Sequence, residues 1–170
     1  MRNLSIVILL ISASVLVTSQ TKQKEDEPKT QERRETTLMN KHAAATFALK
    51  SWNETPFNEM QGMPKLTRVS ATKTYEGDIT GEGKVEYLMM YRADGSATFT
   101  GLERVVGTMG GHSGSFVLQH SGTFEHGIAT VTLSVVPGSG TEALRGLKGE
   151  GRFAVGHQPP YHMTLDYRFE

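Results

Sequence analysis

Residues 81–125 read GEGKVEYLMMYRADGSATFTGLERVVGTMGGHSGSFVLQHSGTFE, and this stretch decides the fold. It contains three apolar-rich runs, at residues 85–92, 97–106 and 115–124. Asp94-Gly95 separates the first run from the second, and Gly110-Gly111 separates the second from the third. Dipeptides of this kind between apolar segments are typical of β-hairpin turns. The stretch therefore predicts three consecutive antiparallel strands.

The segment before these strands is predicted to contain two more. Residues 43–52 alternate, with Phe47 on one side and Trp52 on the other. Residues 53–64 contain two prolines and a glycine, which predicts a long loop. The next strand is expected directly after this loop, at residues 66–75.

Three further strands are expected closer to the C-terminus, at residues 128–136, 148–155 and 162–169, with one helical turn at residues 142–145. Eight strands without a substantial helix indicate an all-β fold. We expect a closed eight-stranded antiparallel up-and-down barrel, because closure removes the exposed edges of an open sheet. A sandwich of the same strands is the alternative. Several strands carry polar and apolar residues on both faces, which favours a small barrel with a few polar groups inside.

The N-terminal residues 1–19 have the pattern of a secretory signal peptide. Arg2 gives a positive start, an apolar run follows at residues 6–17, and Val17 and Ser19 are placed as at a cleavage site. A membrane anchor is the alternative, but the run is shorter than the roughly 20 residues that span a bilayer. We expect cleavage after Ser19, a periplasmic or secreted mature protein, and no membrane contact once the signal is removed.

The composition of the rest of the chain predicts a flexible linker followed by one domain. Residues 20–42 are polar and mixed in charge, which predicts a disordered linker ahead of a barrel domain at residues 43–170. The 18 basic and 18 acidic residues form no basic cluster, which argues against a nucleic-acid partner. The chain has no Cys, so it has no disulfides and its core alone must hold the domain together.

The amino-acid sequence of the chain closely resembles that of a known family. The relevant strings are GDITGEGKVEYLMMYRADGSATFTGLERVVGTMGGHSGSFVLQHSGTFEHG at residues 77–127, VVPGSGTEALRGLKGEG at 135–151 and TLDYRFE at 164–170. They resemble an uncharacterised bacterial family of small β-barrels, a domain of unknown function that is similar in fold to the plant enzyme allene oxide cyclase. The resemblance covers residues 43–170 and implies this barrel fold and self-association as a homo-oligomer. It implies no activity, because fold and function separate readily.

Short sequences that approach catalytic or phosphate-binding motifs lack the context of those motifs. Residues 111–115 (GHSGS) approach G-x-S-x-G but end in Ser and follow a turn glycine. Residues 81–84 and 137–140 lack the spacing and the following helix of a phosphate-binding loop. The six histidines show no compact ligand spacing. We therefore expect no cofactor and no metal.

Glu103 and His120 are the strongest candidate site residues. His120 lies inside a predicted strand on an apolar face, where it is either a buried His bonded to a neighbour or an acid–base group. Glu103 lies among apolar residues, where burial without a partner is costly. If Glu103 faces the lumen, it could bind or protonate a ligand. If it faces outward, it pairs with Lys73 or Arg104.

Four other residues are weaker candidates for a ligand site. Tyr87 and Tyr91 share a strand face and could line a pocket, as could Trp52, although aromatic residues on strands more often serve packing. Glu86 raises the same question of direction as Glu103.

Three hypotheses for function follow. The first is an exported barrel without enzymatic activity that binds a small, largely apolar molecule, whose polar group meets Glu103, His120 or Tyr91. The second is an isomerase or cyclase-like enzyme that uses Glu103 and His120 as an acid–base pair in the lumen. The third is a structural oligomer without a pocket.

Overall fold

A computed structural model describes residues 40–156 and 158–170. The predicted signal peptide, and the predicted linker up to residue 39, lie outside the described residues. The strands are β1 (Lys41–Asn58), β2 (Lys65–Gly77), β3 (Ile79–Tyr91), β4 (Ala97–Met109), β5 (His112–Glu125), β6 (Ile128–Val135), β7 (Leu147–Val155) and β8 (Tyr161–Phe169), with a short 3-10 helix, η1 (Glu142–Leu144), between β6 and β7.

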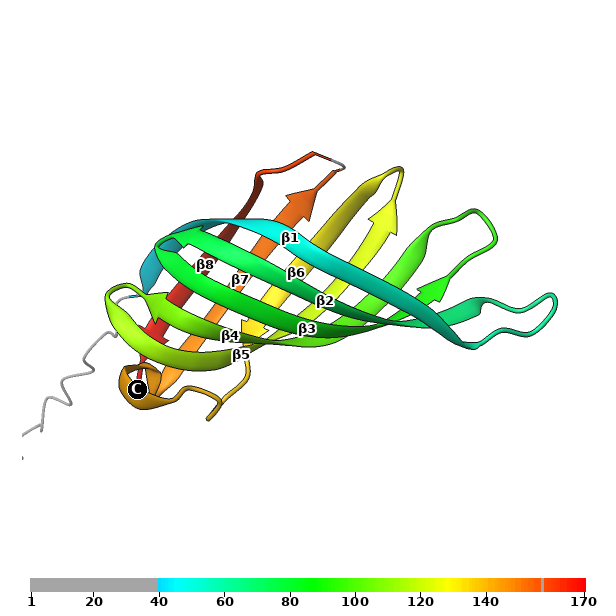
Figure 1. Cartoon of the computed structure of the whole chain (residues 1–170). Coiled ribbons are helices and arrows are strands. Elements are labelled where there is room, and N and C mark those ends of the chain that lie inside the picture. Colours follow the sequence, from blue (N-terminus) through cyan, green and yellow to red (C-terminus); the bar gives the residue numbers. More distant parts are fainter. Residues whose placement is uncertain (1–39, 157) are drawn as a thin grey trace, which may run out of the picture. The chain divides into compact units, whose positions relative to one another are not determined.

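The eight strands close into one barrel in simple sequence order (Figure 1). Each strand pairs antiparallel with the next, and β8 pairs antiparallel with residues Lys41–Phe47 of β1. The closed eight-stranded antiparallel up-and-down barrel predicted from the sequence is therefore confirmed. The predicted helical turn also forms, as η1.

Alternation along the strands separates an inner face from an outer face. In β3, for example, Val85, Tyr87 and Met89 are buried, while Glu86 and Leu88 between them are exposed. This is the period of two that a strand with one face toward a core requires.

One end of the barrel is filled by apolar side chains. Met109 from β4, Phe116 from β5 and Leu165 from β8 are buried almost completely there, and Leu144 of η1 is fully buried. Figure 1 shows η1 at this end of the barrel, beside the C-terminus. The barrel therefore has one filled end, and any internal space lies toward the other.

β1 extends further than the sequence suggested. It begins at Lys41, and residues 53–58, which were predicted to belong to a loop, continue it. Pro56 is accommodated because this half of β1 pairs with β2 alone, since the partners on β8 end opposite Phe47. A proline is tolerated on such an edge segment, because the side of the strand without a neighbour needs no backbone N–H donor.

The predicted sides of β1 are wrong beyond Leu49. The pairing with β2 shifts by one residue between Leu49 and Ser51, which marks a β-bulge. After the shift, Trp52 and Glu54 line the same internal space as Phe47. Strict alternation had put Trp52 on the opposite side from Phe47.

Candidate functional site

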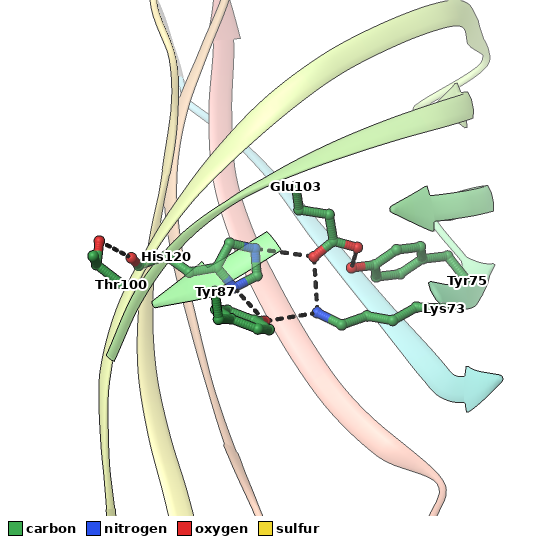
Figure 2. Close-up of polar contacts among 6 residues, drawn as sticks. All are labelled: Lys73, Tyr75, Tyr87, Thr100, Glu103 and His120. Carbon is green, nitrogen blue, oxygen red and sulfur yellow. Dashed lines mark hydrogen bonds and ion pairs between the residues drawn. The ribbon is translucent and has the colours of Figure 1, made fainter. Parts of the chain in front are cut away.

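A buried cluster of polar side chains lies inside the barrel. Its members are contributed by four strands, and the relative exposure of each is 5% or less: Lys73 and Tyr75 from β2, Tyr87 from β3, Glu103 from β4 and His120 from β5. Figure 2 shows these side chains pointing toward one another. The hydroxyl of Thr100, also drawn there, donates to the backbone carbonyl of His120 at 3.0 Å and not to a side chain of the cluster.

Glu103 is the centre of this cluster. Its Oε1 accepts a hydrogen bond from the Tyr75 hydroxyl at 2.6 Å, and its Oε2 accepts one from Lys73 Nζ at 2.8 Å. Lys73 Nζ also donates to the Tyr87 hydroxyl at 3.2 Å. That hydroxyl keeps its own proton and can donate it to His120 Nδ1, 3.1 Å away. Because His120 Nε2 in turn lies 3.0 Å from Glu103 Oε2, the contacts close a ring of four side chains: Lys73, Tyr87, His120 and Glu103.

Two glycines leave room for this arrangement. A Cβ on Gly83 of β3 would overlap the Glu103 carboxylate, and a Cβ on Gly101 of β4 would overlap the Tyr87 ring. Gly83 pairs with Lys73 on the neighbouring strand β2. Because Gly83 has no side chain, groups from β2 and β4 can meet across the strand that separates them.

The ionisation of the cluster follows from these contacts. Burial raises the pKa of Glu103, but the Lys73 ammonium, together with the contact to His120, outweighs burial and holds this pKa at about 2. Burial lowers the pKa of Lys73, but the Glu103 carboxylate more than offsets this, so the net shift is upward. Burial and the Glu103 charge raise the pKa of Tyr75 well above its usual range. At neutral pH the cluster therefore contains one ammonium and one carboxylate.

His120 completes the cluster as a neutral ring. Its Nδ1 accepts from Tyr87, so the imidazole proton lies on Nε2. Nε2 lies 3.0 Å from Glu103 Oε2, but the geometry is not that of a hydrogen bond, and within residues 40–156 and 158–170 Nε2 has no hydrogen-bond partner. Burial lowers the pKa of His120 more than the Glu103 carboxylate raises it, so the ring is uncharged at pH 7.

A cavity of about 440 Å³ lies next to the cluster, toward the unfilled end of the barrel. Volumes of this size are typical of small-molecule sites. Of the five cluster residues, Lys73 and Tyr87 line the cavity. The other lining side chains are mostly aromatic or aliphatic, and they include Phe47, Leu49, Met89, Phe99, Phe124, Val131, Phe153, Val155 and Tyr161.

A second polar group stands among the lining residues. The Glu54 carboxylate accepts hydrogen bonds from Thr67 at 2.7 Å, Tyr91 at 2.8 Å and Trp52 at 3.2 Å. Burial opposes its ionisation, but these bonds outweigh burial and lower the pKa of Glu54. Burial and the bond to this carboxylate raise the pKa of Tyr91 to about 12. Lys65 lies over the Tyr91 ring, 5.7 Å from its centroid.

The structure brings most of the predicted site residues together. Glu103 and His120 meet inside the barrel, although neither lines the cavity itself. Tyr87, Tyr91 and Trp52 do line it. Glu86 does not belong to the site, because it lies on the outer face of β3, where it accepts a hydrogen bond from Ser70.

Sequence reasoning missed three members of the site: Lys73, Tyr75 and Glu54. Lys73 was considered only as an outward partner of Glu103, yet its pairing is inside the barrel. It alternates in phase with Val69, Ala71 and Tyr75 along β2. A lysine on an otherwise apolar strand face was the signal that could have found it.

The described part of the chain contains neither a grouping of three His, Asp or Glu residues suited to a metal ion nor a helix long and apolar enough to cross a membrane.

Comparison with known proteins assigns a family. The chain is similar to a crystal structure of a protein with unknown function from Shewanella oneidensis MR-1, a member of the DUF3224 family. The two share 30% sequence identity and superpose with a TM-score of 0.65, over 77% of this chain and 98% of that one. A search of curated proteins gave no match. The similarity to allene oxide cyclase stays a prediction, since these findings do not bear on it. The family profile described as "Protein of unknown function (DUF3224)" matches residues 43–167. The chain therefore belongs to the DUF3224 family.

Proposed function

We propose that this barrel binds a small, largely apolar molecule in the cavity between the polar cluster and the unfilled end. The observation that carries the proposal is the 440 Å³ cavity itself, whose walls are mostly aromatic and aliphatic. Burial of apolar ligand surface in such a space is favourable at about 25 cal/mol per Å². Lys73 and Tyr87 supply the convergent polar groups that orient a ligand in sites of this kind.

Dye binding tests this function. N-phenyl-1-naphthylamine is neutral and apolar, and its fluorescence rises when it leaves water. We expect it to bind the wild-type protein and to lose affinity for Val131→Phe, because Val131 is buried on β6 and lines the cavity. The matched control is Thr130→Phe, since the neighbouring Thr130 is exposed. Equal binding to both variants would place the dye elsewhere and contradict the proposal.

The proposal includes export, which rests on the signal pattern of residues 1–19. N-terminal sequencing of the mature protein tests it. We expect a sequence beginning at Gln20, and material outside the cytoplasm that begins at Met1 would contradict it.

A second candidate is an isomerase-like reaction in which the cluster moves a proton. It is favoured by the chain of contacts from Lys73 through the Tyr87 hydroxyl to His120. In such a reaction Tyr87 takes a proton from the ligand while passing its own to His120. Glu103 and His120 then act through Tyr87, because they do not line the cavity.

Proton exchange distinguishes this candidate from simple binding. The candidate predicts that the protein speeds deuterium uptake next to the carbonyl of a bound ketone, and that Tyr87→Phe abolishes this effect. Binding without faster exchange would leave the first function alone.

A further inference from the structure

The Lys73 ammonium has one N–H that the cluster does not use. An ammonium carries three donors, and Lys73 Nζ bonds to the Glu103 carboxylate and the Tyr87 hydroxyl. No third acceptor for Nζ is present among residues 40–156 and 158–170. The side chain is 3% exposed and nevertheless lines the cavity. The remaining neighbours of Nζ are aromatic ring faces, which attract an ammonium more weakly than an oxygen acceptor does, so a ligand that supplies an oxygen gains affinity.

The surroundings of the ammonium set the shape of the group that meets it. Nζ lies 5.0 Å from the ring centroid of Phe47 and 5.6 Å from that of Phe153. Both rings also line the cavity. A ligand that reaches Nζ must therefore pass between aromatic walls, which favour a flat, apolar body.

The charges near the cavity favour a neutral group over an ion. The Lys73 charge is already balanced by Glu103, from which it lies 2.8 Å away. A carboxylate ligand would add an unbalanced negative charge inside the barrel, with the Glu54 carboxylate also among the lining residues. A cationic ligand would face the Lys73 ammonium.

From these three observations we infer that the inner end of the cavity is a subsite for the carbonyl oxygen of a neutral, flat, apolar molecule, and that the free N–H of Lys73 donates to this oxygen. This inference rests on the proposed binding function and names the chemical class of its ligand, an aromatic or polycyclic ketone or ester.

Three probes of similar shape test the inference on the full domain. They are 2-acetylnaphthalene, 2-ethylnaphthalene and 2-naphthoate, each titrated at pH 7.5 as a competitor of N-phenyl-1-naphthylamine. A hydrogen bond to a charged donor predicts that the ketone binds about tenfold more tightly than the ethyl compound. The naphthoate is expected to bind more weakly than the ketone.

The outcomes separate this inference from the proposed function. Equal affinity of the ketone and the ethyl compound would overturn the carbonyl subsite and leave apolar binding intact. Tightest binding of the naphthoate would replace the subsite with an anion site. If the dye bound but none of the probes displaced it, the carbonyl subsite would be contradicted and apolar binding would stand. If the dye did not bind, both the proposed function and the subsite would be contradicted.

A double variant tests whether Lys73 causes the preference for the ketone over the ethyl compound. The double variant Lys73→Met/Glu103→Gln removes both charges together and so avoids a lone buried carboxylate. We expect the ratio of ketone affinity to ethyl-compound affinity to fall from about ten to about one. An unchanged ratio in the folded variant would overturn the role of Lys73. The wild-type titrations decide the subsite even if the variant does not fold.

Discussion

Lys73→Met is the substitution that most directly probes the polar cluster. It keeps most of the side-chain volume but removes the ammonium that lies 2.8 Å from Glu103 Oε2. The Glu103 side chain is 0% exposed and would remain inside with only neutral partners. Breaking a buried ion pair in this way leaves an uncompensated charge, which is strongly destabilising.

The structure sets the size of the effect. The pKa of Glu103 lies at about 2, against an ordinary value of 4.5, and the Lys73 ammonium is the largest cause that lowers it. A shift of this size corresponds to about 3 kcal/mol. Breaking buried pairs in other proteins costs about 3–5 kcal/mol. We therefore expect Lys73→Met to lower the free energy of unfolding by about 3 kcal/mol at pH 7.5.

The pH dependence of the variant should reverse in sign. In the wild type the Glu103 contribution is present above pH 4.5 and is lost as the pH falls toward 2, because the folded-state pKa is lowered. Without the ammonium, the folded cluster takes up a proton on Glu103 or His120, and the pKa of that group rises above its unfolded value. The variant should then gain stability on acidification from pH 8 to pH 6.

Urea unfolding at pH 8, 7 and 6, followed by circular dichroism, measures both effects. The matched control is Lys84→Met, because Lys84 is exposed on β3, and its effect should stay within about 0.5 kcal/mol. A Lys73→Met protein within about 1 kcal/mol of the wild type, or one whose stability does not rise on acidification from pH 8 to pH 6, would refute the reasoning.

Three more predictions concern the same cluster. His120→Gln should weaken the wild-type loss of stability below pH 6.5, because burial lowers the folded-state pKa of this His. Urea unfolding at pH 7.5 and 5.5 measures this, and an equal change in the free energy of unfolding between the two pH values in variant and wild type would contradict it. Tyr75→Phe removes the 2.6 Å hydrogen bond to the carboxylate and should cost about 1–3 kcal/mol in urea unfolding, more than Tyr167→Phe, whose equally buried ring has no side-chain hydrogen bond in the described residues. Gly83→Ala should lower the melting temperature by several degrees, because its methyl group would overlap the Glu103 carboxylate. Gly156→Ala is the control, because its methyl group meets no atom within 4 Å, and equal melting temperatures of the two variants would contradict the prediction.

The fold could be predicted because it follows from local sequence patterns, namely turn dipeptides and alternation along the strands. The turn dipeptides at residues 94–95 and 110–111 lie between β3 and β4 and between β4 and β5, and alternation set the faces of these strands. His120 could be placed on an apolar strand face for the same reason, whereas alternation left the direction of Glu103 open. Both are now seen to face inward.

The rest of the site depends on features that act between strands. The bulge after Leu49 follows from pairing with β2, and it turns Trp52 and Glu54 inward against the local alternation. Lys73 contacts Glu103 from two strands away, across Gly83. No spacing of residues along the chain predicts this contact. Register and closure therefore had to be known before the cluster could be assembled.

Two expectations lie beyond the described structure. Self-association stays a prediction, and light scattering of the purified protein after size-exclusion chromatography would measure it. Export stays a proposal that N-terminal sequencing tests.

The measurement that tests the central claim most directly is native mass spectrometry of the protein purified without detergent from its own host. The account predicts an additional mass bound to the wild type, kept in Thr130→Phe and lost in Val131→Phe, because Val131 lines the cavity. Retention of the same mass by Val131→Phe, or its absence from every sample together with no dye binding, would contradict a ligand in the barrel.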